Sequence, residues 1–285
     1  MILLTSGQRR GRSLDMQRHL APLGVTLDAR GFSSDLVADA DALLPTEGAE
    51  ICYLNTVYPE LSGKKYLAPD PATYRLCEDK RALVEHLAEA GFGAYLPLPR
   101  EDAPVLRKPR IGTGGKHATE CSFDEVGQGD QWAWQRRVET DSEYAAHMLV
   151  DAAGEIRMAR QVRYAHRPGL IRRGLRDGQG QVQALPQAHA AVFAAMLRHI
   201  GFRGFCCIDY FVEEGAPLVL EINGRIGASL MRMAGPMAQA YLQALDPAAT
   251  AAWPAPVWPA QVRQNVRLRD RLARLRRHQP AGQPV

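Results

Sequence analysis

The sequence predicts a mixed α/β protein that begins with a parallel α/β unit. A short apolar run over residues 1–5 is followed by a loop and then by a helical pattern over residues 13–20, which is a common start for parallel α/β domains. Residues 72–90 form the clearest helical pattern in the chain, and strand patterns predominate from residue 105. Of the 285 residues 46% are hydrophobic, which excludes a predominantly disordered chain.

The first part of the chain contains three short apolar segments that we predict to be strands. They cover residues 1–5, 25–28 and 50–54. The helix predicted over residues 72–90 has Gly91 as its stop signal.

A linker marked by Pro97, Pro99 and Pro104 separates this part from a strand-rich region. The elements predicted there are strands over 105–108 and 132–135, a hairpin of 144–151 with 155–161, a helix over 186–200, and a hairpin over 204–223.

The sequence also indicates the cellular compartment. No apolar run reaches the roughly 18–20 residues that a membrane-spanning helix needs. The N-terminal apolar segment precedes Arg9 and Arg10 rather than following a basic stretch, which is the reverse of a secretory signal. Five cysteines without a C-x-x-C pair favour neither a disulfide framework nor a structural zinc site. We therefore expect a cytoplasmic protein that does not bind a membrane.

Positive charge is concentrated near the C-terminal end. The formal net charge is +4, yet residues 262–278 hold seven arginines and one aspartate, Asp270, a net charge of +6. Leu268, Leu272 and Leu275 have helical spacing, which predicts an amphipathic helix. A basic helix can bind nucleic acid. Because no aromatic residue lies among the arginines to stack on bases, we favour a helix docked on its own domain through the leucines.

The last predicted hairpin brings acidic side chains together. Side chains alternate between faces along a strand, so Val219, Glu221 and Asn223 should share one face. If the turn is centred on Gly215, the residue numbers of cross-strand partners sum to about 430. This register places Asp209 directly opposite Glu221.

Two opposed carboxylates favour a bound cation. Directly opposed residues have Cβ atoms roughly 4.5–5.5 Å apart, and like charges there destabilise a sheet. Oxygen ligands favour Mg²⁺ or Mn²⁺, and Mg²⁺ usually completes its shell with phosphates and water. We therefore predict that Asp209, Glu221 and Asn223 bind Mg²⁺, with Mn²⁺ as a substitute, beside a phosphate-bearing substrate. The alternative is an exposed strand face on which the carboxylates pair with arginines.

A glycine-rich segment lies about a hundred residues before this hairpin. Lys108 ends a predicted strand, and Gly112, Gly114 and Gly115 follow it. A strand lysine supplies a positive charge, and glycines let backbone N–H groups approach phosphate oxygens. The spacing is not that of a Walker A loop, and an ordinary hairpin turn is the alternative interpretation.

The order of these motifs resembles the ATP-grasp superfamily, most closely the branch of the carbamoyl-phosphate synthase large subunit. The motifs are Glu78-Asp79-Lys80, Lys108-Pro109 with glycines 112–115, Glu143-Tyr144, Asp209, and Glu221-Ile222-Asn223-Gly224-Arg225 followed by Gly227. The resemblance covers about residues 72–235 and implies an ATP-grasp fold, in which two α+β subdomains hold ATP behind a shortened N-terminal parallel α/β domain. The domains it implies are residues 1–72, an ATP-grasp domain over 73–245 with its lid at about 104–138, and a basic tail over 246–285.

The resemblance also implies roles for single residues in nucleotide binding. Lys80 and Lys108 would contact the ATP phosphates, and Lys108 would also lie along the adenine. Gly112, Gly114 and Gly115 would belong to the lid loop over the phosphates. Glu143 would bind the ribose hydroxyls.

The remaining implied roles concern the metal and the reaction. Asp209, Glu221 and Asn223 would hold two Mg²⁺ ions that bridge the phosphates. Arg225 would stabilise the phosphoryl group in flight or the acyl-phosphate formed from it. This division of labour fits phosphoryl transfer, which depends mostly on positioning and charge neutralisation.

The reaction implied by the resemblance is ADP-forming ligation of a carboxylate to an amine through an acyl-phosphate. Both substrates would be small molecules of the amino acid or peptide class, and the resemblance allows a homodimer. We assign Arg163 and Arg172 as carboxylate binders because they flank a predicted loop ahead of the metal hairpin, with solvated arginines as the alternative. No protein nucleophile is required, so the histidines at 117, 147, 166 and 189 are expected to be surface or packing residues.

Three other functions stay open at this point. One is an ATP-grasp kinase that stops at a phosphorylated product. Another is a non-catalytic module that binds ATP and Mg²⁺. The third is nucleic-acid binding through residues 262–278.

Overall fold

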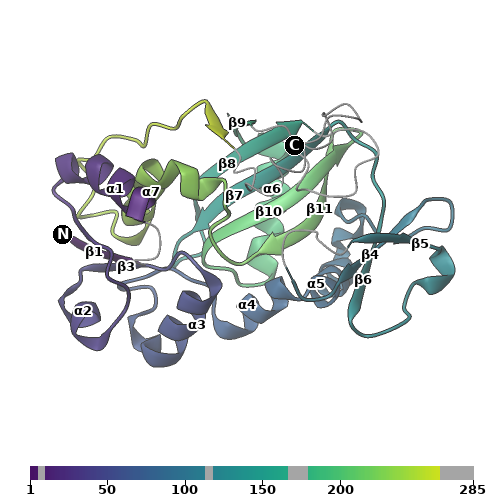
Figure 1. Cartoon of the computed structure of the whole chain (residues 1–285), viewed down its shortest axis with the longest axis horizontal. Helices are drawn as coiled ribbons and strands as arrows, with labels where there is room; N and C mark the ends of the chain where they lie inside the picture. The colour runs from purple at the N-terminus through teal and green to yellow at the C-terminus, as the bar shows by residue number, and fades with distance from the viewer. Residues whose placement is uncertain (6–9, 113–117, 166–178, 264–285) are drawn as a thin grey trace, which may run out of the picture.

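The computed structural model describes residues 1–5, 10–112, 118–165 and 179–263. In this part of the chain, a small N-terminal sheet and a second small sheet lie at opposite ends of a central six-stranded sheet (Figure 1). Some sequence predictions fall outside the described residues, namely those for Gly114, Gly115, His117, His166, Arg172 and the helix of the basic tail.

The N-terminal unit is the predicted parallel α/β unit, with the strand order β2-β1-β3. Its elements are β1 (Ile2–Thr5), α1 (Arg10–Leu20), β2 (Thr26–Asp28), α2 (Ser34–Asp39), β3 (Ala42–Leu44) and α3 (Gly48–Val57). Leu3 and Leu4 of the central strand are both fully buried, in separate apolar clusters. Both faces of this sheet are therefore covered, as is usual for parallel sheets.

The prediction of a strand over residues 50–54 is wrong, because these residues lie in α3. A capping box formed by Glu47 and Glu50 fixes the start of this helix. Ile51 and Leu54 then fall on one buried face at helical spacing. A short apolar run does not distinguish a strand from a helix by periodicity alone, and the third strand is β3 instead.

The helix predicted over residues 72–90 is two helices, α4 (Pro71–Glu78) and α5 (Lys80–Leu87). Asp79 between them has an extended backbone, with φ −95° and ψ 96°. Its side chain caps α5 by accepting a hydrogen bond from the third residue of that helix. The break therefore places Lys80 in the first turn of α5.

The central sheet is antiparallel, with the strand order β11-β10-β7-β8-β9-β12. Its strands are β7 (Ser142–Val150), β8 (Ile156–Ala165), β9 (Gln179–Ala184), β10 (Gly204–Glu213), β11 (Ala216–Asn223) and β12 (Gln261–Arg263). Helix α6 (Gln187–His199) packs on one face, and α7 (Ala234–Leu245) lies against the other face beside the N-terminal unit (Figure 1). Both predicted hairpins are confirmed by this topology.

The second small sheet has the order β5-β4-β6, with β4 (Val105–Pro109), β5 (Thr119–Cys121) and β6 (Trp132–Arg136). An ion pair joins it to the central sheet, because Arg136 Nη1 and Nη2 donate to the two carboxylate oxygens of Glu213 at 2.8 and 2.6 Å. These hydrogen bonds hold the pKa of Glu213 below its ordinary value of 4.5.

Helix α7 fastens the N-terminal unit to the rest of the molecule. The buried hydroxyl of Tyr241 donates to the carbonyl oxygen of Leu43 at 2.7 Å and accepts from the backbone N–H of Leu67 at 2.7 Å. Gln239 of the same helix contacts His19 of α1, with Oε1 and Nε2 2.8 Å apart.

In the described part of the chain, no helix has both the length and the apolar run needed to cross a bilayer.

We predict that Tyr241→Phe lowers the free energy of unfolding by about 1–3 kcal/mol, because it leaves a buried carbonyl and a buried N–H without their partner. Urea unfolding measures the change. The matched control is Tyr53→Phe, since the Tyr53 side chain is 39% exposed and water can replace its contacts. Equal stability of the two variants would show that the hydroxyl of Tyr241 does not stabilise the junction.

We also predict that Glu213→Gln flattens the acid dependence of stability. A depressed carboxyl pKa stabilises the fold above about pH 4.5, and this contribution is lost as pH falls through the lower pKa of the folded state. The stability difference between native protein and variant should therefore shrink as pH falls from neutral to well below 4.5. Urea unfolding at a series of pH values tests this, with the exposed Glu60→Gln as control. A constant difference across the series contradicts it.

Candidate functional site

The two predicted acidic residues of the β10–β11 hairpin face each other. Asp209 pairs directly with Glu221, as the sequence predicts, and the Asp209 side chain is buried. On the other side of β10, Asp209 pairs with Ala145 of β7, so it lies in the interior of the sheet rather than at its edge. Opposed carboxylates at a buried position are destabilising unless positive charge or hydrogen-bond donors lie nearby.

A β-bulge sets this opposition. The turn is made by Glu214 and Gly215, both with positive φ, and near the turn the residue numbers of partners sum to 429 rather than the predicted 430. The register shifts between Asp209 and Tyr210, and beyond the shift the sum is 430. The prediction that Val219 shares the face of Glu221 is wrong for the same reason, since Val219 pairs with Tyr210 in the apolar core.

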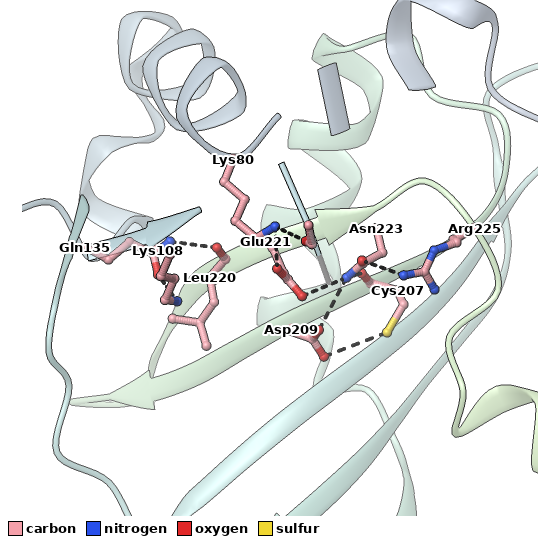
Figure 2. Close-up of polar contacts among 10 residues, drawn as sticks. Lys80, Lys108, Gln135, Cys207, Asp209, Leu220, Glu221, Asn223 and Arg225 are labelled. Atoms are coloured by element: carbon pink, nitrogen blue, oxygen red, sulfur yellow. Dashed lines mark hydrogen bonds and ion pairs between the residues drawn. The ribbon is translucent and has the colours of Figure 1, made fainter. Parts of the chain in front are cut away.

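The Asn223 amide lies between the two carboxylates (Figure 2). Its Nδ2 donates to Asp209 Oδ2 at 3.3 Å and to Glu221 Oε1 at 3.2 Å. Its Oδ1 accepts from Arg225 Nη2 at 3.3 Å. The amide thus connects both acids to the guanidinium that follows them in sequence.

Lys80 approaches this group from the opposite side, at the start of α5 (Figure 2). Its Nζ lies 3.6 Å from Glu221 Oε2 and donates to the carbonyl oxygen of Gly112. The position of the helix start is fixed because Arg110 Nε donates to both carboxylate oxygens of Asp79 at 2.7 Å. Burial alone would raise the pKa of Asp79, but the hydrogen bonds from Arg110 and from the Ala82 N–H together with the charge of Arg110 outweigh it, and the net pKa is lowered.

Lys108 approaches the β10–β11 hairpin from strand β4 of the second small sheet. It donates to Gln135 Oε1, and Gln135 Nε2 donates to the carbonyl oxygen of Leu220 at 2.7 Å. Lys80 and Lys108 therefore both lie beside β11, one contributed by a helix start and one by strand β4 (Figure 2).

The structure places the other two described candidates, Glu143 and Arg163, on opposite faces of the central sheet. Glu143 lies on β7, two residues from the Ala145 that pairs with Asp209, so it shares the face of the carboxylates and is buried. Arg163 pairs with Tyr144 and therefore lies on the opposite face of the sheet, where its Nε donates to Ser142 Oγ at 2.9 Å. Arg163 is not brought to the carboxylates.

The donor set suits a magnesium ion that shares its shell with a nucleotide. Two carboxylates and one amide oxygen are available, the latter after rotation of the Asn223 side-chain amide. Among the described residues, no three His, Cys, Asp or Glu side chains gather as a metal cage. Mg²⁺ commonly takes one or two protein carboxylates and completes its octahedron with phosphates and water. The residues therefore fit Mg²⁺ bound together with phosphate.

The loop that carries Arg225 packs on the central sheet beside the carboxylates. Ser229 Oγ lies 2.7 Å from Nε2 of His147, which is fully buried on β7. A Cβ on Gly227 would lie 2.7 Å from both Cys207 Sγ and His147 Cε1. The absence of a side chain at Gly227 thus allows the loop to lie directly on the sheet beside the carboxylates.

Two residues of this arrangement, Gln135 and Ser229, were not predicted from the sequence. Gln135 and Ser229 contact the site through partners 27 to 85 residues away along the chain, and no local pattern indicates such contacts. His147 was expected to be a surface or packing residue, and it is a packing residue with a specific hydrogen bond. Its spacing from Glu143 on one strand, at i+4, was the available signal.

Comparison with known proteins places the site in a recognised domain. A family model described as the ATP-grasp domain matches residues 77–229, more than half of the chain. This segment contains Lys80, Lys108, Glu143, Asp209 and Glu221. No curated protein sequence matches the chain.

Solved structures share the fold at low sequence identity. Pyruvate carboxylase from Rhizobium etli superposes with a TM-score of 0.61 at 15% identity over 91% of this chain, which spans 29% of that enzyme. D-alanine–D-alanine ligase from Bacillus anthracis, complexed with ATP, gives 0.56 at 14% identity over 88% of this chain and 98% of its own. L-amino acid ligase from Bacillus licheniformis gives 0.57 at 14% identity, covering 86% and 69%.

We predict that Gly227→Ala lowers the free energy of unfolding by about 1–3 kcal/mol, because the new methyl group collides with buried atoms of Cys207 and His147. Chemical unfolding measures the loss. Gly93→Ala is the matched control, since its Cβ would make an ordinary contact with Leu98 at 3.8 Å on a helical backbone. A Gly227→Ala variant as stable as this control would show that the loop is not tightly packed on the sheet.

Proposed function

The chain belongs to the ATP-grasp family, and on this premise we propose that it is an ATP-dependent, ADP-forming ligase that joins a small carboxylate to an amine. The observation that carries the proposal is a row of contacting side chains: Lys80 of α5, Glu221 and Asn223 of β11, and Arg225 of the loop after it, with Asp209 buried opposite Glu221 (Figure 2). The acids and the amide thus lie between an ammonium and a guanidinium, which provides both metal ligands and positive charge for phosphate.

In this proposal the two lysines bind the nucleotide phosphates. The capped break at Asp79 places Lys80 at the start of α5, and the Lys80 ammonium contacts Glu221 and the Gly112 carbonyl oxygen. Lys108 is oriented by Gln135 and approaches from the small sheet, beside which Gly112 lies. Glu143, on the face of the carboxylates, would accept hydrogen bonds from the ribose hydroxyls.

Asp209, Glu221 and Asn223 would hold magnesium, which neutralises phosphate charge and aligns the terminal phosphoryl group. Asn223 would turn its amide oxygen toward the ion, which would release the hydrogen bond that this oxygen now accepts from Arg225 and leave the guanidinium available to phosphate. Burial of Asp209 lowers the local dielectric response and strengthens its attraction for a cation.

Arg225 would stabilise the phosphoryl group during transfer. A carboxylate oxygen of the substrate bonds to the γ-phosphorus while the bond to the β–γ bridging oxygen breaks, giving an acyl-phosphate and ADP. The amine nitrogen then attacks the acyl carbon, phosphate leaves, and the nitrogen loses a proton. Positive charge is needed where the phosphoryl oxygens accumulate charge, and the Arg225 guanidinium lies next to the metal ligands.

A ligase is favoured over the other candidate functions by its relatives in fold. Two of the solved structures that the chain resembles are a D-alanine–D-alanine ligase and an L-amino acid ligase. A module that only binds nucleotide has no need for a guanidinium fixed beside the metal ligands, which argues against a purely regulatory role.

The test is ADP release from ATP and Mg²⁺ in the presence of pooled amino acids and dipeptides. Glu221→Ala should lower the rate by roughly 10²–10³-fold, because it removes a metal ligand and the partner of Lys80. The exposed Glu60→Ala, in the N-terminal unit, should retain native activity. Equal ADP release by native protein and Glu221→Ala would refute the proposed catalytic site.

Product analysis separates the remaining candidates. A ligase forms an amide and free phosphate, whereas a kinase forms a stable phosphate ester without free phosphate. Native protein that binds ATP and Mg²⁺ but releases no ADP with any pooled substrate would be a binding module. Arg163→Ala should not affect the rate of ADP release, since Arg163 lies on the opposite face of the sheet from the carboxylates.

A further inference from the structure

A pocket of 280 Å³ lies between the N-terminal unit and the loop that follows β11. It is bounded by Thr5 at the end of β1, by the first turns of α1, by the start of α3 and by residues 225–231. The ends of parallel strands and the starts of the helices that follow them are where α/β units bind small ligands. Arg225 lines this pocket and also contacts Asn223 of the proposed metal site, so the two sites adjoin at this residue.

One part of the pocket supplies positive charge. Arg225 lines it on the side of the carboxylates, and Arg12 lines it from the first turn of α1. Arginine is well suited to bind a carboxylate, because its planar group donates parallel hydrogen bonds. A ligand carboxylate bound here would lie next to Asn223 and the proposed metal site.

Another part of the pocket supplies hydrogen-bond acceptors. Glu47 lines it at the start of α3, beside Thr46, whose hydroxyl donates to Glu50 Oε2 at 3.2 Å. Since the Thr46 proton is directed to Glu50, its hydroxyl oxygen offers lone pairs to a ligand. A carboxylate and a hydroxyl acceptor suit an ammonium, which has three donors and no acceptor.

Glu47 also makes this end of the pocket unsuitable for a second anion. Its carboxylate accepts a hydrogen bond from the Glu50 N–H in the capping box, so the positive end of α3 already has an anionic partner. A phosphate or a second carboxylate would be repelled at this position. The lining therefore disfavours phosphorylated ligands and dicarboxylates.

The remaining wall is apolar. Met16, Ile226, Ala228 and Met231 line it, and none of these side chains offers a hydrogen bond. The pocket volume of 280 Å³ is close to the lower end of the roughly 300–1,000 Å³ that small-molecule sites span, so the pocket suits a ligand as small as a single amino acid.

From these features we propose that the pocket binds the carboxylate substrate as a single α-amino acid with an apolar side chain. Its carboxylate lies between Arg12 and Arg225, its ammonium contacts Glu47, and its side chain packs on Met16 and Met231. This assignment rests on the proposed ligase function, because it treats the pocket as the place from which a carboxylate receives the phosphoryl group.

The experiment is calorimetric binding to the full protein with Mg²⁺ and ADP. The probes are leucine, methionine and valine, each in both enantiomers, together with 4-methylpentanoate, leucinamide and glutamate. At least one of the apolar amino acids should bind. Its affinity should be at least tenfold higher than that of the analogue without the ammonium and that of the analogue without the carboxylate. Glutamate should bind no better than these analogues.

The variant Glu47→Gln identifies the ammonium contact. It should weaken binding of the amino acid at least tenfold and leave binding of 4-methylpentanoate unchanged, because that compound has no ammonium. Glu60→Gln is the matched control and should change neither. Thermal unfolding shows whether Glu47→Gln folds, and Arg12→Gln, which should weaken both ligands, provides a second variant outside the capping box.

Three outcomes would overturn this inference: no binding of any apolar amino acid, equal binding of leucine and 4-methylpentanoate, or an equal loss of both with Glu47→Gln. These outcomes are distinct from failure of the ligase proposal. If ADP release depends on Glu221 with some other carboxylate, the ligase proposal stands and the pocket assignment fails. If the amino acid binds as described but no substrate elicits ADP, the pocket assignment stands and the ligase proposal fails.

Discussion

The opposition of Asp209 and Glu221 across neighbouring strands is the constraint on which the rest of the site depends. Two like charges at this spacing destabilise a sheet, and one of them is buried. The Asn223 amide between the acids and the Lys80 ammonium beside Glu221 reduce this repulsion. The bulge, the capped helix break and the packed loop are the local structures that hold these groups in place.

The sequence was sufficient for those parts of the site that depend on alternation and turn chemistry. Asp209 and Glu221 could be paired because a glycine marked the turn and strand periodicity did the rest. The parallel unit at the start of the chain and both hairpins were likewise predictable from short apolar runs between turns. The agreement at Asp209 was helped by the bulge, since the turn itself is displaced by one in register.

What could not be predicted depends on helix capping, strand register and packing between elements rather than on the apolar pattern of one segment. The helical state of residues 50–54 is decided by a capping box and by burial against other elements, not by the apolar run itself. Val219 lies on the opposite face from the predicted one because of the bulge, which no nearby residue in the sequence indicates. Arg163 was assigned from its proximity to a loop in sequence, whereas its face is fixed by its pairing with Tyr144. Gln135 enters the site only because β6 pairs with β4.

The hydroxyl of Tyr241 has a consequence for the way this molecule is made. It bonds to a carbonyl 198 residues earlier, so the β2-β1-β3 sheet leaves the ribosome well before α7 and lacks this hydrogen bond until nearly the whole described chain has been synthesised. Contacts of such long sequence separation slow folding. Nascent chains that end before α7 should therefore expose the apolar surface that this helix covers and depend on chaperones to remain in solution.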